Sequence, residues 1–237
     1  MTILSEAEIA SRRAAALTAI ARAAEKAGRP AESVALLAVT KGQPAEVVRR
    51  AARAGFTLFG ENRVQEGLAK IEAVREELPD LTWRLIGPLQ TNKAAQALQW
   101  FAAVESMDRQ RLADRLERLL AGSERRFPVL VEVNLASEAS KSGVAPEEAL
   151  SLTRAVAACP HLEARGLMAV PPFDADPESS RPHFRRLREL RDRLADSLGR
   201  ALPEISAGMS HDFTVAIEEG STEVRLGTAL FGPREAA

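Results

Sequence analysis

The sequence is poor in cysteine and has no excess of charge of either sign. Cys159 is its only cysteine, so neither an intramolecular disulfide nor a thiolate metal cluster is available within one chain. The 32 lysine and arginine residues are balanced by 33 aspartate and glutamate residues, which gives a formal net charge of −1. A chain without a broad positive field does not attract a polyanion, so we expect no nucleic-acid partner.

Long apolar segments are also missing. No apolar run approaches the roughly 20 residues that a helix needs to span a bilayer. The start of the chain, Met1 to Glu6, lacks the basic and apolar regions of a signal peptide. We therefore expect a cytoplasmic protein that does not associate with membranes. The three histidines, His161, His183 and His211, are too far apart in sequence to suggest a pair of metal ligands.

Short apolar runs alternate with longer amphipathic segments along the chain. Residues 34–39 form a continuous apolar run, which is typical of a parallel strand buried on both faces. Pro44 and Gly55 flank a segment with helical spacing, as expected for the first turn and the end of a helix. Ser5 and Glu8 have the spacing of a capping box and predict an earlier helix. The repeated alternation predicts eight strands, at 34–39, 57–59, 83–86, 102–105, 129–133, 164–170, 204–207 and 223–226, with helices between them at 45–54, 63–78, 91–101, 108–120, from Pro146 onward, 178–201 and 213–219.

Strands that alternate with helices imply right-handed βαβ units and a parallel sheet. Eight such strands most simply close into an α/β barrel of the TIM type, (β/α)8, and a doubly wound open sheet is the alternative. No linker rich in proline, glycine and serine interrupts the pattern, and the one loosely structured segment is 171–177. We therefore predict a single domain over 1–237, with an N-terminal helix in 1–30 that packs on the barrel.

Polar residues and glycines collect directly after the predicted strands, where a barrel builds its active face. Ser210 and the pair Gly227-Thr228 follow the seventh and eighth strands, between which barrels often bind a phosphate group. The two hydroxyl groups can donate to phosphate oxygens, and the glycine permits close approach of the backbone. Each of these residues taken singly would also suit an ordinary turn. Together they predict an anion site.

Lys41 and Arg225 supply further chemistry at the same rim. Lys41 follows the first apolar strand and is one of only five lysines in the chain. Partial desolvation at this position favours the neutral amine, which can add to a carbonyl group. Arg225 precedes Gly227 by two residues, so both project to the same side of the strand. A fixed cation beside a pyridine nitrogen keeps that nitrogen unprotonated, so pyridoxal phosphate held here would be a weak electron sink.

Several motifs occur in a fixed order between Leu36 and Gly232: 37–41 (LAVTK), 59–66 (FGENRVQE), 86–93 (IGPLQTNK), 141–143 (KSG), 165–168 (RGLM), 208–212 (GMSHD) and 224–232 (VRLGTALFG). As an ordered set they resemble the pyridoxal phosphate homeostasis protein family, single-domain relatives of the N-terminal barrel of alanine racemase. The resemblance implies that pyridoxal 5′-phosphate (PLP) is held by these side chains: Lys41 as a Schiff base, Ser210, Gly227 and Thr228 at the phosphate, Arg225 at the pyridine nitrogen, and Asn62, Met168 and Met209 around the ring.

The sequence departs from this family at few positions. Many relatives have tyrosine where this chain has Arg63, which affects what covers the mouth of the pocket. His211 falls at a variable position of its motif, and we interpret it as a loop residue and not as a base. Lys93 and Lys141 lie within motifs, but the sequence assigns no role to either of them.

The same lysine, phosphate site and arginine would also suit a PLP-dependent amino-acid racemase. The bacterial alanine racemase that the chain resembles takes its opposing base, a tyrosine, from a second domain of the partner subunit. This chain has no tyrosine and ends at Ala237, soon after the last motif. A lysine Schiff-base aldolase acting on a phosphosugar is a second alternative.

We therefore predict a PLP-binding protein of vitamin B6 homeostasis that is not an enzyme. Its candidate partners are PLP itself and PLP-dependent apo-enzymes, and we expect a monomer or a weak dimer.

Overall fold

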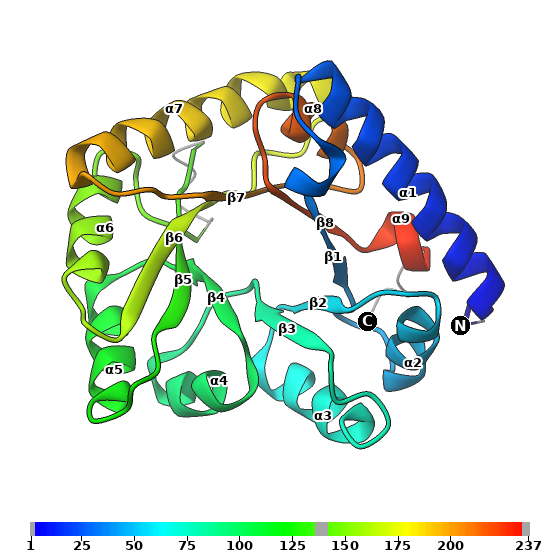
Figure 1. Ribbon diagram of the computed structural model, residues 1–237, viewed down its shortest axis with the longest axis horizontal. Helices are drawn as coiled ribbons and strands as arrows, with labels where there is room; N and C mark the ends of the chain where they lie inside the picture. The colour runs from blue at the N-terminus through cyan, green and yellow to red at the C-terminus, as the bar shows by residue number, and fades with distance from the viewer. Residues whose placement is uncertain (1–2, 136–141, 234–237) are drawn as a thin grey trace.

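The computed structural model describes residues 3–135 and 142–233, and its strands form a closed parallel barrel in sequential order (Figure 1). Strand β8 pairs with β1, with Leu36 opposite Val224 and Ala38 opposite Leu226, and this pairing closes the barrel. The predicted TIM-type barrel is confirmed, and the open doubly wound sheet is wrong. The strands are β1 (Ala35–Val39), β2 (Leu58–Glu61), β3 (Thr82–Leu85), β4 (Ala103–Met107), β5 (Phe127–Glu132), β6 (Leu162–Met168), β7 (Glu204–Met209) and β8 (Glu223–Leu226).

Helices connect the strands and form the outer ring of the barrel (Figure 1). The first helix, α1, begins at the predicted capping box, where Ser5 Oγ accepts the Glu8 N–H (3.3 Å) and the Glu8 carboxylate accepts the Ser5 N–H (2.8 Å). It packs against α2, α8 and α9. The helices are α1 (Glu6–Lys26), α2 (Ala45–Arg53), α3 (Val64–Val74), α4 (Ala94–Trp100), α5 (Gln110–Leu120), α6 (Ala149–Ala157), α7 (Arg181–Leu198), α8 (Phe213–Glu218) and α9 (Thr228–Phe231), with short 3₁₀ turns η1 (Ala31–Ser33), η2 (Thr91–Lys93) and η3 (Pro177–Ser180).

The predicted elements differ from the observed ones mainly at their ends. Strand β2 continues to Glu61 and β7 to Met209, because Glu61 pairs with Leu85 and Met209 with Arg225 of the neighbouring strands. Only β8 has the predicted bounds. The helix predicted at 178–201 begins as η3, and α7 ends before Gly199, whose φ is 59°. Helix α9 was not predicted. Strand ends depend on the length of the neighbouring strand, which is remote in sequence.

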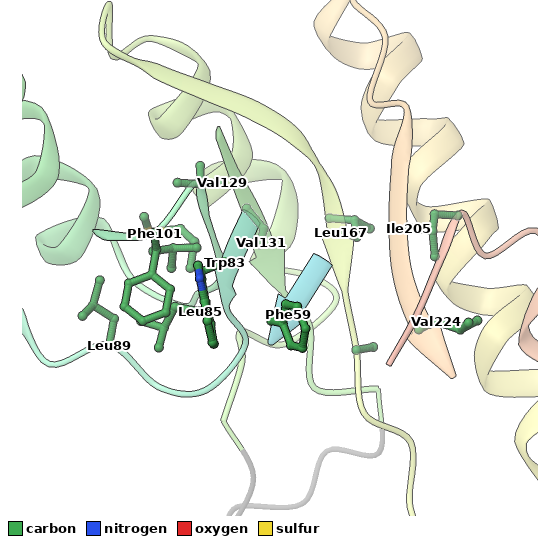
Figure 2. Close-up of a cluster of buried hydrophobic side chains, with 14 of the residues drawn as sticks. Phe59, Trp83, Leu85, Leu89, Phe101, Val129, Val131, Leu167, Ile205 and Val224 are labelled. Carbon is green, nitrogen blue, oxygen red and sulfur yellow. The ribbon is translucent and has the colours of Figure 1, made fainter. Parts of the chain in front are cut away.

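Apolar side chains on the outer face of the barrel pack against the helices (Figure 2). Phe59 of β2 and Trp83 of β3 stack with their ring centroids 5.1 Å apart. Ile205 of β7 and Val224 of β8 continue the same buried layer on the other side of the barrel. Burial of such side chains contributes about 1.5–3 kcal/mol each. This layer fixes the strands whose ends carry the candidate site.

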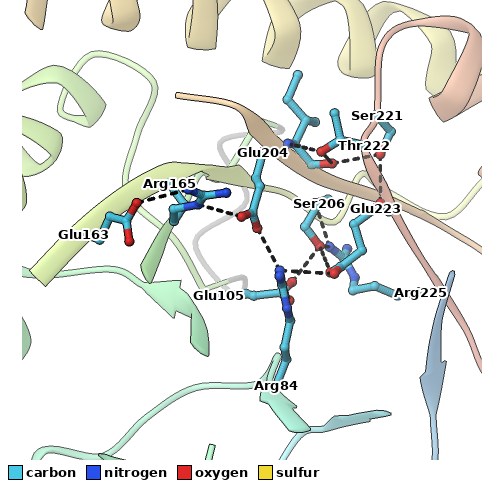
Figure 3. A network of polar contacts seen from close by, with 11 residues as sticks. Arg84, Glu105, Glu163, Arg165, Glu204, Ser206, Ser221, Thr222, Glu223 and Arg225 are labelled. Carbon is cyan, nitrogen blue, oxygen red and sulfur yellow. Dashed lines mark hydrogen bonds and ion pairs between the residues drawn. The ribbon is translucent and has the colours of Figure 1, made fainter. Parts of the chain in front are cut away.

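The inner face of the barrel is polar near β3, β4, β7 and β8 (Figure 3). Because successive side chains of a strand point to opposite faces, Glu223 lies inside when Val224 packs outside. The Arg84 guanidinium reaches from β3 to Glu204 (2.8 Å) and Glu223 (3.1 Å). Burial and the neighbouring Glu105 carboxylate raise the pKa of Glu223 well above its ordinary value. Part of the barrel interior is therefore occupied by a charged network.

Candidate functional site

A cavity of about 420 Å³ opens at the C-terminal ends of the strands. Its volume falls within the range of about 300–1,000 Å³ typical of small-molecule sites. The structure brings nearly all of the predicted site residues to its wall: Lys41, Asn62, Met209, Ser210, Arg225, Gly227 and Thr228. Met168 is the exception. It is only 1% exposed at the end of β6 and is not among the lining residues, so its contact with a ring stays a prediction.

Lys41 occupies a tight turn directly after β1. The Gln43 N–H donates to the Thr40 carbonyl (2.9 Å) across the turn. Gly42, the third residue, has a φ of 72°, as a type II turn requires at that position. The sequence Thr-Lys-Gly-Gln therefore places the lysine at the second position, partly buried and on the cavity wall.

Ser210 joins the loops after β7 and β8. Its hydroxyl oxygen accepts the N–H groups of Gly227 (3.3 Å) and Ala229 (3.0 Å). A serine hydroxyl has two acceptor sites and one hydrogen, so both acceptor sites are occupied and the hydrogen is left to donate to another group. The Thr228 side chain lies on the same wall of the cavity. These two hydroxyl groups fit an anion such as a phosphate.

Gly87 allows the loops after β2 and β3 to meet at the cavity. A Cβ atom on Gly87 would lie 2.3 Å from the Asn62 carbonyl oxygen, closer than real Cβ contacts permit. Glycine at this position therefore lets Asn62 and Pro88 share one wall.

Arg225 is held rigidly at the base of the cavity. Its side chain is 4% exposed and donates to the carbonyls of Ser206 (2.6 Å) and Ala169 (2.9 Å). It also donates to the Ser206 hydroxyl (2.6 Å), which links the cavity to the charged network inside the barrel (Figure 3). The guanidinium is therefore a fixed positive charge on the cavity wall.

Glu132, at the end of β5, is a cavity residue that the sequence reasoning missed. Its side chain is buried, and burial together with the Asp108 carboxylate raises the pKa of Glu132 to about 7, while Arg225 acts in the opposite direction. The residue lies within the predicted strand 129–133, between Val131 and Val133. An acidic residue near the C-terminal end of a buried strand was the signal available.

Replacement of Glu132 by glutamine is expected to stabilise the cofactor-free protein at alkaline pH. A carboxyl group with a raised pKa contributes stability that is complete below its unfolded pKa and is lost as the pH rises through the folded value. Raising the pKa from 4.5 to about 7 corresponds to about 3 kcal/mol, so Glu132→Gln should gain up to about that much at pH 8 and little at pH 4.5. Urea unfolding at both pH values measures the difference. Glu124→Gln, at an exposed position, is the control, and equal gains for the two variants would contradict this prediction.

Of the other residues that the motifs singled out, only His211 lines the cavity among the described ones. His211 lies at the cavity mouth, where its Nε2 is 3.0 Å from the Ala175 carbonyl and its ring contacts Phe173. Arg63 is exposed at the start of α3, and neither Arg63 nor Lys93 lines the cavity. Lys141 lies outside the described residues. In the described part of the chain, no group of three or more histidine, cysteine, aspartate or glutamate side chains is arranged to hold a metal ion. Likewise, no helix there has the length and apolar character needed to cross a membrane.

The fold and the cavity define the protein as a (β/α)8 barrel with a small-molecule site at the C-terminal ends of its strands. Residues 15–235 match the family described as alanine racemase, N-terminal domain. The pyridoxal phosphate homeostasis protein of Aquifex aeolicus is 45% identical over 219 residues, covering 92% of this chain and 95% of that protein. The Pseudomonas aeruginosa protein of the same name is 46% identical and covers 91% of each chain. The chain belongs to the pyridoxal phosphate homeostasis protein family, and the resemblance predicted from its motifs is confirmed.

Solved structures agree with this assignment. PipY of Synechococcus elongatus, determined with PLP bound, superposes with a TM-score of 0.84 at 35% identity and covers 94% of this chain and 100% of its own. Alanine racemase of Corynebacterium glutamicum has a TM-score of 0.71 at 19% identity, and the match covers 65% of that enzyme. The second comparison supports the barrel fold alone.

Proposed function

We propose that the protein binds pyridoxal 5′-phosphate reversibly as a Schiff base on Lys41 and acts in intracellular vitamin B6 homeostasis, without strong catalytic activity of its own. The observation that carries this proposal is the presence of Lys41, two hydroxyl groups and Arg225 on the wall of one cavity. The name shared by the curated relatives and the PLP-bound structure of PipY support it.

The cavity residues fit the chemical groups of this cofactor. PLP supplies an aldehyde that condenses with an amine, and Lys41, on the cavity wall, would provide that amine. The hydroxyl groups of Ser210 and Thr228 would donate to the phosphate, and Arg225 would face the pyridine nitrogen. Gln43, which is buried, lines the same cavity.

The direct test is borohydride reduction of the protein after incubation with PLP. We expect a yellow protein whose imine is reduced to a stable secondary amine, with the phosphopyridoxyl group on Lys41, since this lysine lies beside the predicted phosphate site. Peptide mass mapping locates the label. Lys41→Ala is the control variant, which should take up no phosphopyridoxyl group. Labelling of Lys93 or Lys141 in the wild type, or of no lysine, would contradict the assignment.

A second prediction separates a carrier from a racemase. The chain contains no tyrosine to act as an opposing base, and the fixed Arg225 would keep the pyridine nitrogen unprotonated. A missing acid or base typically costs about 10² to 10⁴ in rate, so we expect racemase, transaminase and decarboxylase activities near background. Incubation of the PLP-loaded protein with a panel of amino acids, followed by chiral and keto-acid analysis, measures these activities. Turnover near 1 per second that is lost in Lys41→Ala would show that the protein is an enzyme, since this rate lies at about the lower end of the ordinary enzyme range.

The aldolase alternative is distinguished by its lack of cofactor. An aldolase would form its Schiff base with a phosphosugar and would need no cofactor, so the protein as purified would show no visible absorbance. The proposal also includes PLP-dependent apo-enzymes as recipients of the cofactor, with the protein acting in the cytoplasm as a monomer or weak dimer.

A further inference from the structure

A buried ion cluster lies behind the turn that carries Lys41. Lys70, on α3, is 5% exposed. Its ammonium group donates to the Thr40 carbonyl (2.6 Å) and to the carboxylates of Glu61 (2.7 Å) and Glu66 (2.7 Å). A lysine is rarely this buried without a partner of opposite charge, and here it has two.

The same cluster holds the turn at two further points. The Thr40 hydroxyl donates to Glu61 (2.6 Å), and the Gly42 N–H donates to Glu66. The first and third residues of the turn are therefore tied to the cluster, and Lys41 lies between them. Lys70 contacts the carboxylates of both Glu61 and Glu66, so it connects the hydrogen bonds that hold Thr40 and Gly42.

Folding stability alone does not account for such a cluster. Glu61 is fully buried, burial raises the pKa of its carboxyl group, and its second oxygen has no hydrogen-bond partner among the described residues. Buried ion pairs often contribute no more stability than apolar side chains of the same size, because removing charges from water is costly. Lys70, Glu61 and Glu66 all contact the Thr40–Gln43 turn. This turn carries Lys41, the lysine of the proposed site.

We propose that Lys70 is a positioning residue, which holds the Thr40–Gln43 turn so that the Lys41 amine faces the carbonyl group of the cofactor. This inference rests on the proposed function. In the bond-forming step the Lys41 nitrogen attacks the aldehyde carbon, protons shift to the carbonyl oxygen, and water leaves as the C=N bond forms. Orientation of the turn affects this step. It does not affect the phosphate contacts, which come from the loops after β7 and β8.

The test separates covalent from noncovalent binding. Pyridoxine 5′-phosphate has an alcohol in place of the aldehyde and cannot form a Schiff base, whereas PLP can. The double variant Lys70→Met/Glu61→Gln removes both buried charges. We expect it to form the imine with PLP about ten- to a hundredfold more weakly or slowly, because small misplacements of reacting groups have effects of this size. The absorbance of the imine measures this change. Affinity for pyridoxine 5′-phosphate should stay near the wild-type value.

Two further variants keep the test decisive. Arg181→Met is the control variant. Arg181 lies on α7, away from the cavity, and its guanidinium pairs with three carboxylates, those of Glu178, Glu218 and Glu219. This variant should change neither affinity. Glu66→Ala removes the link to Gly42 from a partly exposed position and should reproduce the selective loss in smaller degree, even if the double variant does not fold.

The outcomes distinguish this inference from the proposed function. A wild-type protein that forms no imine on Lys41 overturns both. If the wild type forms the imine on Lys41, two results in the variants would overturn the role of Lys70 alone. One is unchanged imine formation, and the other is equally weak binding of PLP and pyridoxine 5′-phosphate.

Discussion

Replacement of Ser210 and Thr228 together by alanine is expected to weaken PLP binding by about 3–6 kcal/mol, taking about 1.5–3 kcal/mol for each hydrogen bond to a charged group. This corresponds to roughly a hundred- to ten-thousandfold increase in Kd. The Ser210 oxygen already accepts two backbone N–H groups, so its hydrogen is available for the phosphate. Titration of PLP against the variant, followed by absorbance, measures the change.

The design of this experiment must separate lost ligand contacts from a distorted loop. Ser210→Ala also removes the acceptor for the Gly227 and Ala229 N–H groups, whereas Thr228→Ala alone leaves the link between the two loops intact. Thr228→Ala should therefore weaken PLP binding without loss of folding stability. Pyridoxal, which lacks the phosphate, should bind the wild type and the double variant alike. Unchanged affinity for PLP in the folded double variant would mean that the phosphate binds elsewhere.

Replacement of Gly166 by alanine is expected to cause a large loss of folding stability. Gly166 lies on β6 opposite Glu204 of β7, and a Cβ atom there would lie 1.7 Å from the Glu204 carbonyl oxygen. The obstacle is backbone, which cannot turn aside as a side chain can. The two strands would have to separate within a closed barrel, so we expect a cost of about 3 kcal/mol or more, at or above the usual range for overpacking. Urea unfolding followed by tryptophan fluorescence gives the free energy of unfolding.

Gly122 offers a matched control for this substitution. Its φ is 83°, but a Cβ atom there would have no neighbour within 4 Å. Alanine at Gly122 should cost about 1–2 kcal/mol through backbone conformation alone. A Gly166→Ala variant that unfolds at the same urea concentration as Gly122→Ala would show that β6 and β7 can move apart without a large cost.

Much of the candidate site followed from local sequence patterns. Lys41, Ser210 and Gly227 follow predicted strands, and the C-terminal ends of parallel barrel strands meet at one face. Residues within strands were harder to predict. Glu132 interrupts an apolar run and Glu223 is the first residue of β8, and the direction in which each side chain points depends on the register of neighbouring strands. The sequence pattern therefore found the loops of the site but missed the acidic residue on its wall.

Met168 stays a prediction. The family resemblance implies a position near the ring of the cofactor, and the end of β6 lies between β5 and β7, opposite Glu132 and Ser206, with the Met168 side chain almost fully buried. Whether a side chain at a strand end reaches a cavity depends on how far each neighbouring strand extends.

The alternation of apolar periodicities determined by itself that this chain forms eight parallel strands with helices around them, and the ordered motifs determined its family. Both signals are local, because hydrophobic spacing and turn residues act over a few positions. Only the tertiary structure decided which charged side chains face one another: Arg84 with Glu204 and Glu223, and Lys70 with Glu61 behind the Lys41 turn. The Arg84 contacts join strands that are remote in sequence, and Lys70 reaches the Thr40 carbonyl at the end of β1. Such contacts depend on strand register and barrel closure, which no local pattern encodes.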